Sequence, residues 1–374
     1  MNEEQPAYDT YRRQMILPGF GQAAQDKLAA ARVLVVGAGG LGCPVLQYLA
    51  AAGVGHLGIA DGDVVNHSNL HRQVLYSTAD VGQPKAQVAA ARLQAQYPHL
   101  TLSAIAETWT AAHCVAHIDA YDVVVDGTDH FGSKYMLNDA CVLFGKPLVY
   151  GAVSQWQGQV AVFNASLPTG GRSAHYRHLF AQPPAAGTVA SCEEAGVVGM
   201  LPGIIGSMQA LEVLKLLTGL GEPLYNQLLT YDAARQTFYK VKLPTDVGAV
   251  PDMPASTAAL LQWNYDDACA PSDQSSLSVD AATALEWIAR GAVLIDVREL
   301  DELPALQAGT VQRLPMVLAL EKTEWEGEAM LLFVCQRGQR SMQVAKRVKE
   351  LYPRRKVGSI RGGVVAMLAQ PHAK

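Results

Sequence analysis

The stretch Arg32-Val-Leu-Val-Val-Gly-Ala-Gly-Gly-Leu-Gly42 decides the fold of the N-terminal part of this chain. Its apolar start predicts a buried parallel strand, and the glycines that follow (Gly37, Gly39, Gly40 and Gly42) predict a tight turn into a helix. In such a unit the glycines let the backbone approach a phosphate group, and N–H groups of the first helical turn bind it. The stretch therefore predicts a nucleotide-binding domain.

Two carboxylates end the next apolar run, Leu57-Gly-Ile-Ala. Asp61 lies about twenty residues beyond the last glycine, where an acid can accept hydrogen bonds from a ribose, and Asp63 follows closely. On the glycines and this acid alone, the default interpretation is a dehydrogenase that uses a nicotinamide dinucleotide.

Arg72 and Lys85 favour a different chemistry. They stand in Ser68-Asn-Leu-His-Arg-Gln73 and Gly82-Gln-Pro-Lys85, directly after the glycine fingerprint. Helix N–H groups largely neutralise a pyrophosphate, whereas attack on the α-phosphorus of a triphosphate needs cations on the leaving pyrophosphate. The alternative is that both side chains are solvated surface charges. Their position after the fingerprint favours a role with a triphosphate.

Length and composition limit the class of protein. A chain of 374 residues is long enough for two domains, and its net charge of −5 provides no basic surface for nucleic acid or an anionic membrane. Pro202, Gln209, Glu212 and Lys215 interrupt the apolar run 197–217, so we expect no membrane span. A polar, acidic N-terminus and six cysteines without paired spacing indicate a cytoplasmic protein with free thiols.

The sequence pattern predicts two domains of the α/β class. Residues 1–245 alternate strand and helix patterns, with shorter antiparallel strands after residue 150. Within them, residues 165–195 predict a long crossover loop. Residues 246–275 are rich in proline and serine and predict a linker, and residues 276–374 predict a smaller α/β domain.

The first domain resembles the adenylating enzymes of the ThiF/MoeB/HesA type, relatives of the ubiquitin-activating enzymes. The resemblance covers residues 8–243 and includes, besides the segments above, Tyr11-Arg-Arg-Gln14, Gly127-Thr-Asp-His130 and Cys192-Glu-Glu-Ala-Gly-Val-Val-Gly199. It implies a Rossmann-like mixed sheet that binds ATP. It also implies a reaction, the adenylation of the C-terminal glycine of a small ubiquitin-like sulfur carrier protein ending in Gly-Gly.

The resemblance assigns a role to each motif residue. The glycines would line the phosphate and adenosine site, Asp61 would bind the ribose, and Asp129 would bind Mg²⁺. Arg72 and Lys85 would hold the phosphates and stabilise the transition state. The implied ATP-binding residues are Arg13, Gly37, Gly39, Gly40, Gly42, Asp61, Asp63, Asn69, Arg72, Gln73, Lys85 and Asp129.

Arg13 carries an implication for assembly. In the family this arginine reaches the ATP site of a second subunit, which implies a homodimer. From the residues alone, the default interpretation is a solvated cation on a helix face.

Cys192 is a candidate nucleophile in the first domain. It stands in the predicted crossover loop just before a helix start, where the pKa of a thiol is lowered. In the family this position can join covalently to the carrier. The alternative is an inert, buried thiol.

The second domain resembles the rhodanese-type sulfurtransferases. The matching segments are Leu294-Ile-Asp-Val-Arg-Glu299, Cys335-Gln-Arg-Gly-Gln-Arg-Ser341 and Ile360-Arg-Gly-Gly363. Backbone N–H groups between a strand and a helix would converge on the sulfur of Cys335, and Arg337 and Arg340 would add positive potential. The resemblance implies a persulfide on Cys335, charged by an external persulfide donor, that passes sulfur to the activated carboxylate. The alternative is a structural thiol at a strand end.

The chain departs from the family pattern in several places. Most close relatives carry two Cys-x-x-Cys pairs that bind zinc, but here His175-Tyr-Arg-His178 replaces the first pair and the second is missing. Since a closed structural zinc site needs four ligands, we expect no structural zinc. His130 and Lys134 stand where asparagine and arginine are common. Gln307-Ala-Gly-Thr-Val-Gln312 replaces a Gly-His-Ile-Pro-Gly-Ala segment of the rhodanese pattern.

The leading interpretation is an adenylyltransferase for a sulfur carrier of the molybdopterin-synthase small-subunit type, with sulfur transfer by the second domain. Cys192 keeps open a thiamin-thiazole sulfur carrier. The altered rhodanese segment keeps open a carrier-binding scaffold without catalysis. Arg72, Lys85 and the second domain argue against a dehydrogenase.

Overall fold

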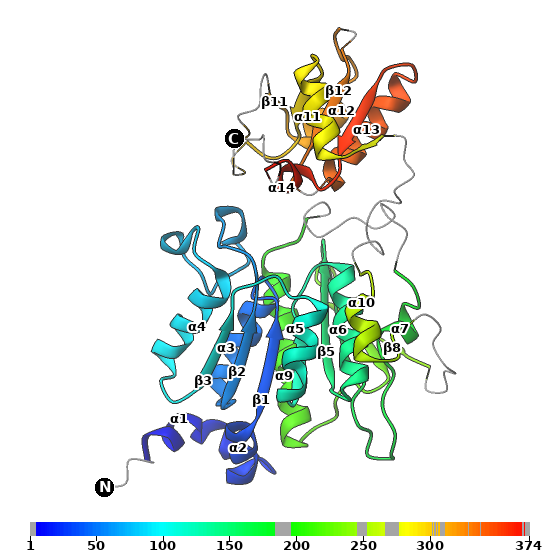
Figure 1. Cartoon of the computed structure of the whole chain (residues 1–374). Helices are drawn as coiled ribbons and strands as arrows, with labels where there is room; N and C mark the ends of the chain where they lie inside the picture. Colours follow the sequence, from blue (N-terminus) through cyan, green and yellow to red (C-terminus); the bar gives the residue numbers. More distant parts are fainter. Residues whose placement is uncertain are drawn as a thin grey trace. The chain divides into compact units, whose positions relative to one another are not determined.

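The chain forms two compact units, residues 1–184 with 190–269 and residues 185–189 with 270–374 (Figure 1). A computed structural model describes residues 5–183 (backbone alone for 5–8), 196–244, 253–265 and 277–370, except 301, 303, 305, 307–310, 328, 337 and 369. Both units are of the expected α/β class.

The first unit is built on a mixed sheet with the strand order β3-β2-β1-β4-β5-β6-β7-β8. Its parallel strands are β1 (Arg32–Val36), β2 (His56–Ala60), β3 (Thr101–Ile105), β4 (Val123–Asp126) and β5 (Leu148–Ser154). Three antiparallel strands continue the sheet, namely β6 (Gln157–Phe163), β7 (Gln227–Asp232) and β8 (Thr237–Lys242). The strand order reverses between β1 and β4, where open α/β sheets bind ligands at the carboxyl ends of their strands.

Helices cover both faces of this sheet (Figure 1). One face packs against α2 (Gly21–Ala30), α3 (Gly42–Ala52), α4 (Lys85–Gln96) and α9 (Met200–Thr218). The other packs against α5 (Ala111–His117), α6 (Phe131–Leu143), α7 (Tyr176–Leu179) and α10 (Thr257–Gln262).

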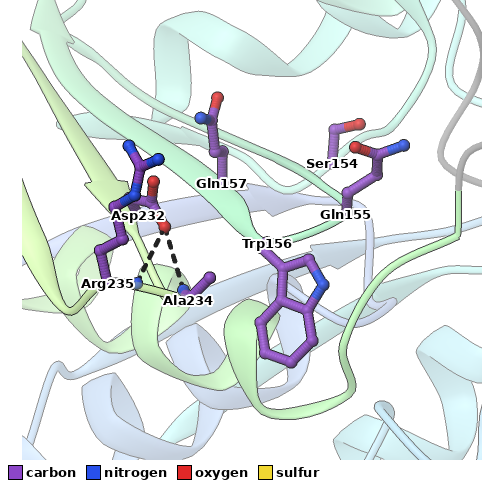
Figure 2. Close-up of a pocket in the computed structure, with 7 residues that line it drawn as sticks. All are labelled: Ser154, Gln155, Trp156, Gln157, Asp232, Ala234 and Arg235. Carbon is purple, nitrogen blue, oxygen red and sulfur yellow. Dashed lines mark hydrogen bonds between the residues drawn. The ribbon is translucent and has the colours of Figure 1, made fainter.

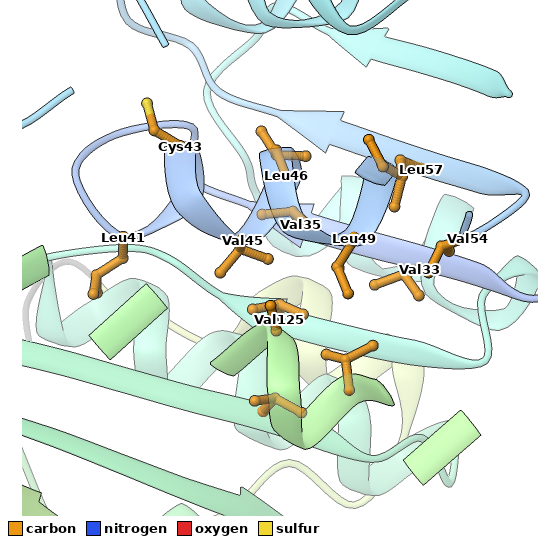
Figure 3. Close-up of a cluster of buried hydrophobic side chains, with 14 of the residues drawn as sticks. Val33, Val35, Leu41, Cys43, Val45, Leu46, Leu49, Val54, Leu57 and Val125 are labelled. Atoms are coloured by element: carbon orange, nitrogen blue, oxygen red, sulfur yellow. The ribbon is translucent and has the colours of Figure 1, made fainter. Parts of the chain in front are cut away.

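Side chains of strand β1 pack on both faces of the sheet. Its Val33 and Val35 pack with side chains of α3 (Figure 3), whereas Leu34 and Val36 belong to the core on the opposite face. Because both faces of the strand are buried, its sequence is a continuous apolar run and does not alternate with polar residues.

Judged by length and composition alone, α9 is the one helix among the described residues that could cross a membrane. Leu201 and Val213 on this helix are fully buried against the sheet. The buried Gln209 amide donates to the carbonyl oxygens of Asp126 (2.8 Å) and Val149 (3.2 Å). These contacts are those of a core helix.

The expected linker over 246–275 is wrong for its middle part, because α10 forms there. The hydroxyl of Ser256 accepts a hydrogen bond from the Ala259 N–H and caps the helix. Leu260 and Tyr265 are buried in the core beside α6. The proline- and serine-rich composition of residues 246–275 did not indicate the short apolar helix α10.

The second unit has a parallel sheet with the order β11-β10-β12-β13-β9. The strands are β9 (Ser278–Val279), β10 (Val293–Asp296), β11 (Val311–Arg313), β12 (Leu331–Val334) and β13 (Val357–Ile360). Helices α11 (Ala281–Ala289) and α14 (Gly363–Leu368) pack on one face, and α12 (Met316–Glu321) and α13 (Gln339–Leu351) pack on the other. Cys335 therefore lies between β12 and α13, at the carboxyl edge of the sheet.

Candidate active site

The glycine turn after β1 requires glycine at two points. Gly37 has a φ of +94°, and a Cβ there would lie 2.6 Å from the carbonyl oxygen of Gly127. A Cβ on Gly42 would overlap the Gly37 carbonyl. No side chain caps the start of α3. The N–H groups of Cys43 and Val45 donate to the carbonyl oxygens of Gly39 (2.9 Å) and Leu41 (3.4 Å), and Pro44 has no N–H, so the Gly42 N–H is the first-turn donor left for a phosphate.

Asp61 holds this turn in place from the end of β2. Its carboxylate accepts hydrogen bonds from the N–H groups of Ala38 (2.7 Å) and Asp63 (2.8 Å). Burial raises the pKa of the Asp61 carboxyl, and the nearby Lys85 charge opposes that rise. A carboxylate has further lone pairs, so Asp61 can also accept a hydrogen bond from a ribose hydroxyl.

Lys85 is the first residue of α4 and is brought to the same place. Its side chain is buried, and its Nζ lies 3.1 Å from Asp63 Oδ2, whose side chain is 61% exposed. The hydroxyl of Tyr76 lies 2.8 Å from the Ala38 carbonyl oxygen and 3.3 Å from that of Lys85, which ties α4 to the glycine turn. Because Asp63 is exposed to water, the Lys85 ammonium can exchange it for a phosphate at little cost.

Arg72 and Gln73 flank the glycine turn from a loop organised by Asn69. The carbonyl of Asn69 accepts from the N–H groups of Arg72 (3.1 Å) and Gln73 (3.0 Å). Arg72 is half-buried and donates to the Ser68 carbonyl at 3.1 Å. The Gln73 Oε1 is buried without a hydrogen-bond partner, and its Nε2 lies 3.5 Å from where a Cβ of Gly39 would stand. A buried, unpaired acceptor costs about 1–3 kcal/mol, so this amide suits a donor group on a ligand.

Asp129 is exposed just beyond β4. It follows Gly127, whose carbonyl packs against Gly37, so it lies beside the glycine turn. The described residues contain no group of three or more His, Cys, Asp or Glu side chains that could hold a metal ion. Mg²⁺ in nucleotide sites usually takes only one or two carboxylates together with the substrate phosphates, and Asp129 fits that pattern.

A buried ion pair supports the turn that carries Asp129. The Lys134 ammonium donates to Asp126 Oδ2 and to the Gly151 carbonyl, both at 2.8 Å. Asp126 also accepts from the Thr128 N–H (2.9 Å) and hydroxyl (2.6 Å). Lys134 therefore braces the turn, a role that the sequence did not indicate.

One residue predicted to bind ATP, Arg13, does not join this cluster. Arg13 is exposed on α1 (Gln5–Met15), whose Gln14 amide donates to the Ala52 carbonyl (2.9 Å) at the C-terminal end of α3. The glycine turn lies at the N-terminal end of α3, which has 11 residues, so it is about 16 Å from Ala52. Arg13 therefore lies far from the nucleotide site of its own chain. Cys192 lies outside the described residues.

A shallow cavity of about 380 Å³ lies elsewhere on the same sheet, between the β5–β6 and β7–β8 turns (Figure 2). Trp156 and Arg235 are among its lining residues. The Asp232 carboxylate accepts from the N–H groups of Ala234 (3.0 Å) and Arg235 (3.1 Å), so it stabilises its own turn. The cavity contains none of the residues predicted to bind ATP.

His175 and His178, which replace a cysteine pair of the family pattern, contact each other at α7, where His175 is the N-cap and the two rings are tilted by 33°. Their ring centroids lie 3.7 Å apart, and His178 Nδ1 accepts from the His175 N–H at 3.0 Å. Burial, with the neighbouring His178 and Arg177, lowers the pKa of His175 to about 4. The pair is therefore neutral at physiological pH.

The α7 segment is held by a buried charge network. Arg177 makes two hydrogen bonds to Asp139 of α6, at 2.7 and 2.6 Å, and the two side chains are 3% and 0% exposed. The hydroxyl of Tyr265 donates to the same carboxylate at 2.8 Å. This network joins α6, α7 and the segment after α10, in the region where relatives are expected to use zinc.

We predict that Arg177→Met destabilises the first unit by about 3–5 kcal/mol, because it leaves the Asp139 carboxylate buried and unpaired. Denaturant unfolding followed by circular dichroism measures this change. Lys146→Met is the matched control, since its partner Asp119 (3.3 Å) has a side chain that is 79% exposed, and such a pair contributes less than about 1 kcal/mol. Equal stability of the two variants would contradict the role of the network.

In the second unit, Cys335 is 2% exposed at the end of β12. Its sulfur accepts from the Gly338 N–H at 3.1 Å and from the Ser341 hydroxyl at 3.5 Å. Gly338 has a φ of +98°, a conformation that turns the loop into α13. Of the backbone N–H groups predicted to converge on the sulfur, that of Gly338 makes the contact seen among the described residues.

The arginines around Cys335 differ from the sequence-based expectation. Arg340 forms a double hydrogen bond with Glu302, at 2.5 and 2.7 Å, which offsets the positive potential expected from it. Arg337 lies outside the described residues. The fully buried Arg298 pairs with Asp296 and also donates to Gln336 Oε1 at 3.1 Å, beside Cys335. Arg298 therefore positions the active loop, which the sequence motif alone did not show.

The unit that carries the nucleotide site matches a known family. The model of the ThiF family covers residues 11–248, and the chain therefore belongs to the ThiF family. This confirms the resemblance to adenylating enzymes inferred from the motifs.

Relatives extend the comparison over both units. A sulfur carrier protein adenylyltransferase of Thermus thermophilus is 53% identical over 233 residues, which cover 62% of this chain and 86% of the relative. A probable adenylyltransferase/sulfurtransferase MoeZ of Mycobacterium tuberculosis is 37% identical over 373 residues, which cover 96% of this chain and 92% of the relative. Similarity to the second relative thus includes the second unit.

A solved structure supports the fold of the first unit. Escherichia coli MccB with ATP has a TM-score of 0.51 and 23% identity, and the match covers 61% of this chain and 68% of that one. At this identity the likeness shows the fold alone.

Proposed function

We propose that this chain adenylates the C-terminal glycine of a small ubiquitin-like sulfur carrier and that its second unit supplies sulfur to the product. The observation that carries the proposal is the convergence of the glycine turn, Asp61, Lys85 and Arg72 at the switch point of the sheet. The names of the Thermus thermophilus and Mycobacterium tuberculosis relatives support both activities.

In the proposed first step, the carrier carboxylate attacks the α-phosphorus of ATP and pyrophosphate leaves. Lys85 and Arg72 stabilise the negative charge that builds on the phosphates, and Asp61 orients the ribose. Asp129 would hold Mg²⁺, which supplies further positive charge to the phosphates. The product is a carrier acyl-adenylate.

In the proposed second step, the Cys335 thiolate takes a sulfur atom from an external persulfide donor. The terminal sulfur of the resulting persulfide attacks the acyl-adenylate carbon and AMP leaves. A second thiol then attacks the Cys335 sulfur of the acyl disulfide, so that the thiocarboxylate leaves and Cys335 forms a disulfide with that thiol. The contacts that support this role are the hydrogen bonds from Gly338 and Ser341 to the Cys335 sulfur.

We also propose a homodimer in a reducing, cytoplasmic setting. In the family this arginine reaches the ATP site of a second subunit, and the distance of Arg13 from the nucleotide site of its own chain supports the same role here. The free thiols of Cys43, Cys114, Cys141 and Cys335 are consistent with a reducing compartment. Light scattering in solution tests the dimer.

ATP–pyrophosphate exchange with candidate carriers tests the adenylation. We expect exchange with a carrier of the molybdopterin-synthase small-subunit type, and loss of exchange when EDTA removes Mg²⁺. Exchange with a thiazole-type carrier only would identify the alternative pathway. No exchange with either carrier would overturn the proposal in favour of a carrier-binding scaffold.

A further inference from the structure

Two buried serine hydroxyls lie behind the Cys335 sulfur. Ser341 of α13 is fully buried, and its Oγ lies 3.5 Å from Cys335 Sγ and 3.1 Å from the Gly338 carbonyl oxygen. Ser359 of β13 is 1% exposed, and its Oγ lies 2.8 Å from Ser341 Oγ and 3.4 Å from the same carbonyl oxygen. Ser359 is not part of the Cys335–Ser341 motif and reaches it through the fold.

The two hydroxyl protons can be arranged in several ways, which fall into two groups. In the first, Ser359 donates to Ser341 or to the Gly338 carbonyl, and the Ser341 proton is free to reach the sulfur. In the second, Ser341 donates to Ser359 or to the Gly338 carbonyl, and the sulfur receives no hydroxyl proton. Each hydroxyl has one proton, so the choice between the arrangements decides how many donors the sulfur has.

A negative charge on the sulfur favours the first group of arrangements. Hydrogen bonds to an ionised acceptor are roughly twice as strong as those between neutral groups. The Ser359 hydroxyl competes with Ser341 for the Gly338 carbonyl, which lies 3.4 Å from Ser359 Oγ and 3.1 Å from Ser341 Oγ. Without Ser359 that carbonyl is left to accept the Ser341 proton in place of the sulfur. Because both serines are buried, water does not replace the missing hydroxyl.

We propose that Ser359 is a positioning residue that directs the Ser341 hydroxyl proton onto the sulfur of Cys335. Its use in catalysis rests on the sulfurtransferase role proposed above, whereas the hydrogen-bond relay is a property of the free thiolate. The relay and the function can therefore be tested separately.

The rate of Cys335 alkylation by iodoacetamide tests the relay in the full chain. At pH 7 we expect Ser359→Ala to slow alkylation about three- to tenfold, the effect of weakening one hydrogen bond to a charged group. Peptide mapping by mass spectrometry is needed to separate Cys335 from the other free cysteines. Ser359→Thr keeps the hydroxyl and is expected to restore the rate.

A double mutant separates a relay from a general packing effect. In the Ser341→Ala background the relay has no second member, so adding Ser359→Ala is expected to slow alkylation no further. Additive effects, or an unchanged rate in Ser359→Ala, would overturn the proposal. If the wild-type chain takes up no sulfur from thiosulfate, the proposed sulfurtransferase function fails, but the alkylation rates still decide the role of Ser359.

Discussion

Lys85→Met is expected to lower ATP–pyrophosphate exchange by about 10²–10³-fold, because it removes a positive charge from the leaving pyrophosphate. The Lys85 side chain is buried beside the glycine turn, so a cation from the solvent does not replace its charge. Methionine keeps the length and apolar character of the lysine stem. The only ion-pair partner of Lys85 among the described residues is Asp63. The Asp63 side chain is 61% exposed, so losing this ion pair has little effect on stability.

The measurement is steady-state exchange at saturating carrier, with unfolding curves to show that the variant is folded. Lys146→Met is the matched control, since this lysine precedes β5 and lies at the opposite end of the sheet. We expect the control to retain wild-type exchange. A Lys85→Met enzyme within tenfold of wild type would show that Lys85 only braces Asp63.

The sequence predicted the central parallel strands β1, β2 and β4 of the first unit because they are buried on both faces. Runs such as Val33–Val36 have no polar alternation, and the glycine turn that follows marks the start of α3. The short helices α7 and α10 escaped prediction because they have only four and six residues and lie within loop-like sequence. Tertiary contacts of Tyr176 and Leu260 with the core stabilise them.

The candidate site was predictable where its residues are close in the sequence. Gly37, Asp61 and Lys85 follow one another along a single α/β unit, so their spacing places them at one edge of the sheet. Pairings between distant residues gave no such signal. Arg340 meets Glu302 through the fold, and Asp139 meets Tyr265 across 126 residues. A charge near Cys335 could therefore be read from the sequence, but its neutralising partner could not.

The second large effect is expected at Cys335. After incubation with thiosulfate, the wild-type chain should gain the mass of one sulfur atom, and Cys335→Ala should gain none. The sulfur of Cys335 accepts hydrogen bonds from Gly338 and Ser341, which stabilise an anionic sulfur. Intact-protein mass spectrometry measures the adduct, and cyanide, which removes persulfide sulfur, distinguishes it from other modifications.

Cys43 and Cys114 are not expected to take up sulfur in place of Cys335. Burial raises the pKa of Cys43 and of Cys114 to about 12, so both remain neutral thiols and poor nucleophiles at neutral pH. Cys114→Ala is therefore a matched control that should keep the full adduct. Because Cys335 belongs to the second unit, Cys335→Ala is also expected to retain ATP–pyrophosphate exchange. An adduct that persists in Cys335→Ala would place the persulfide on another thiol, and loss of exchange together with the adduct would show that the two activities are coupled rather than separable.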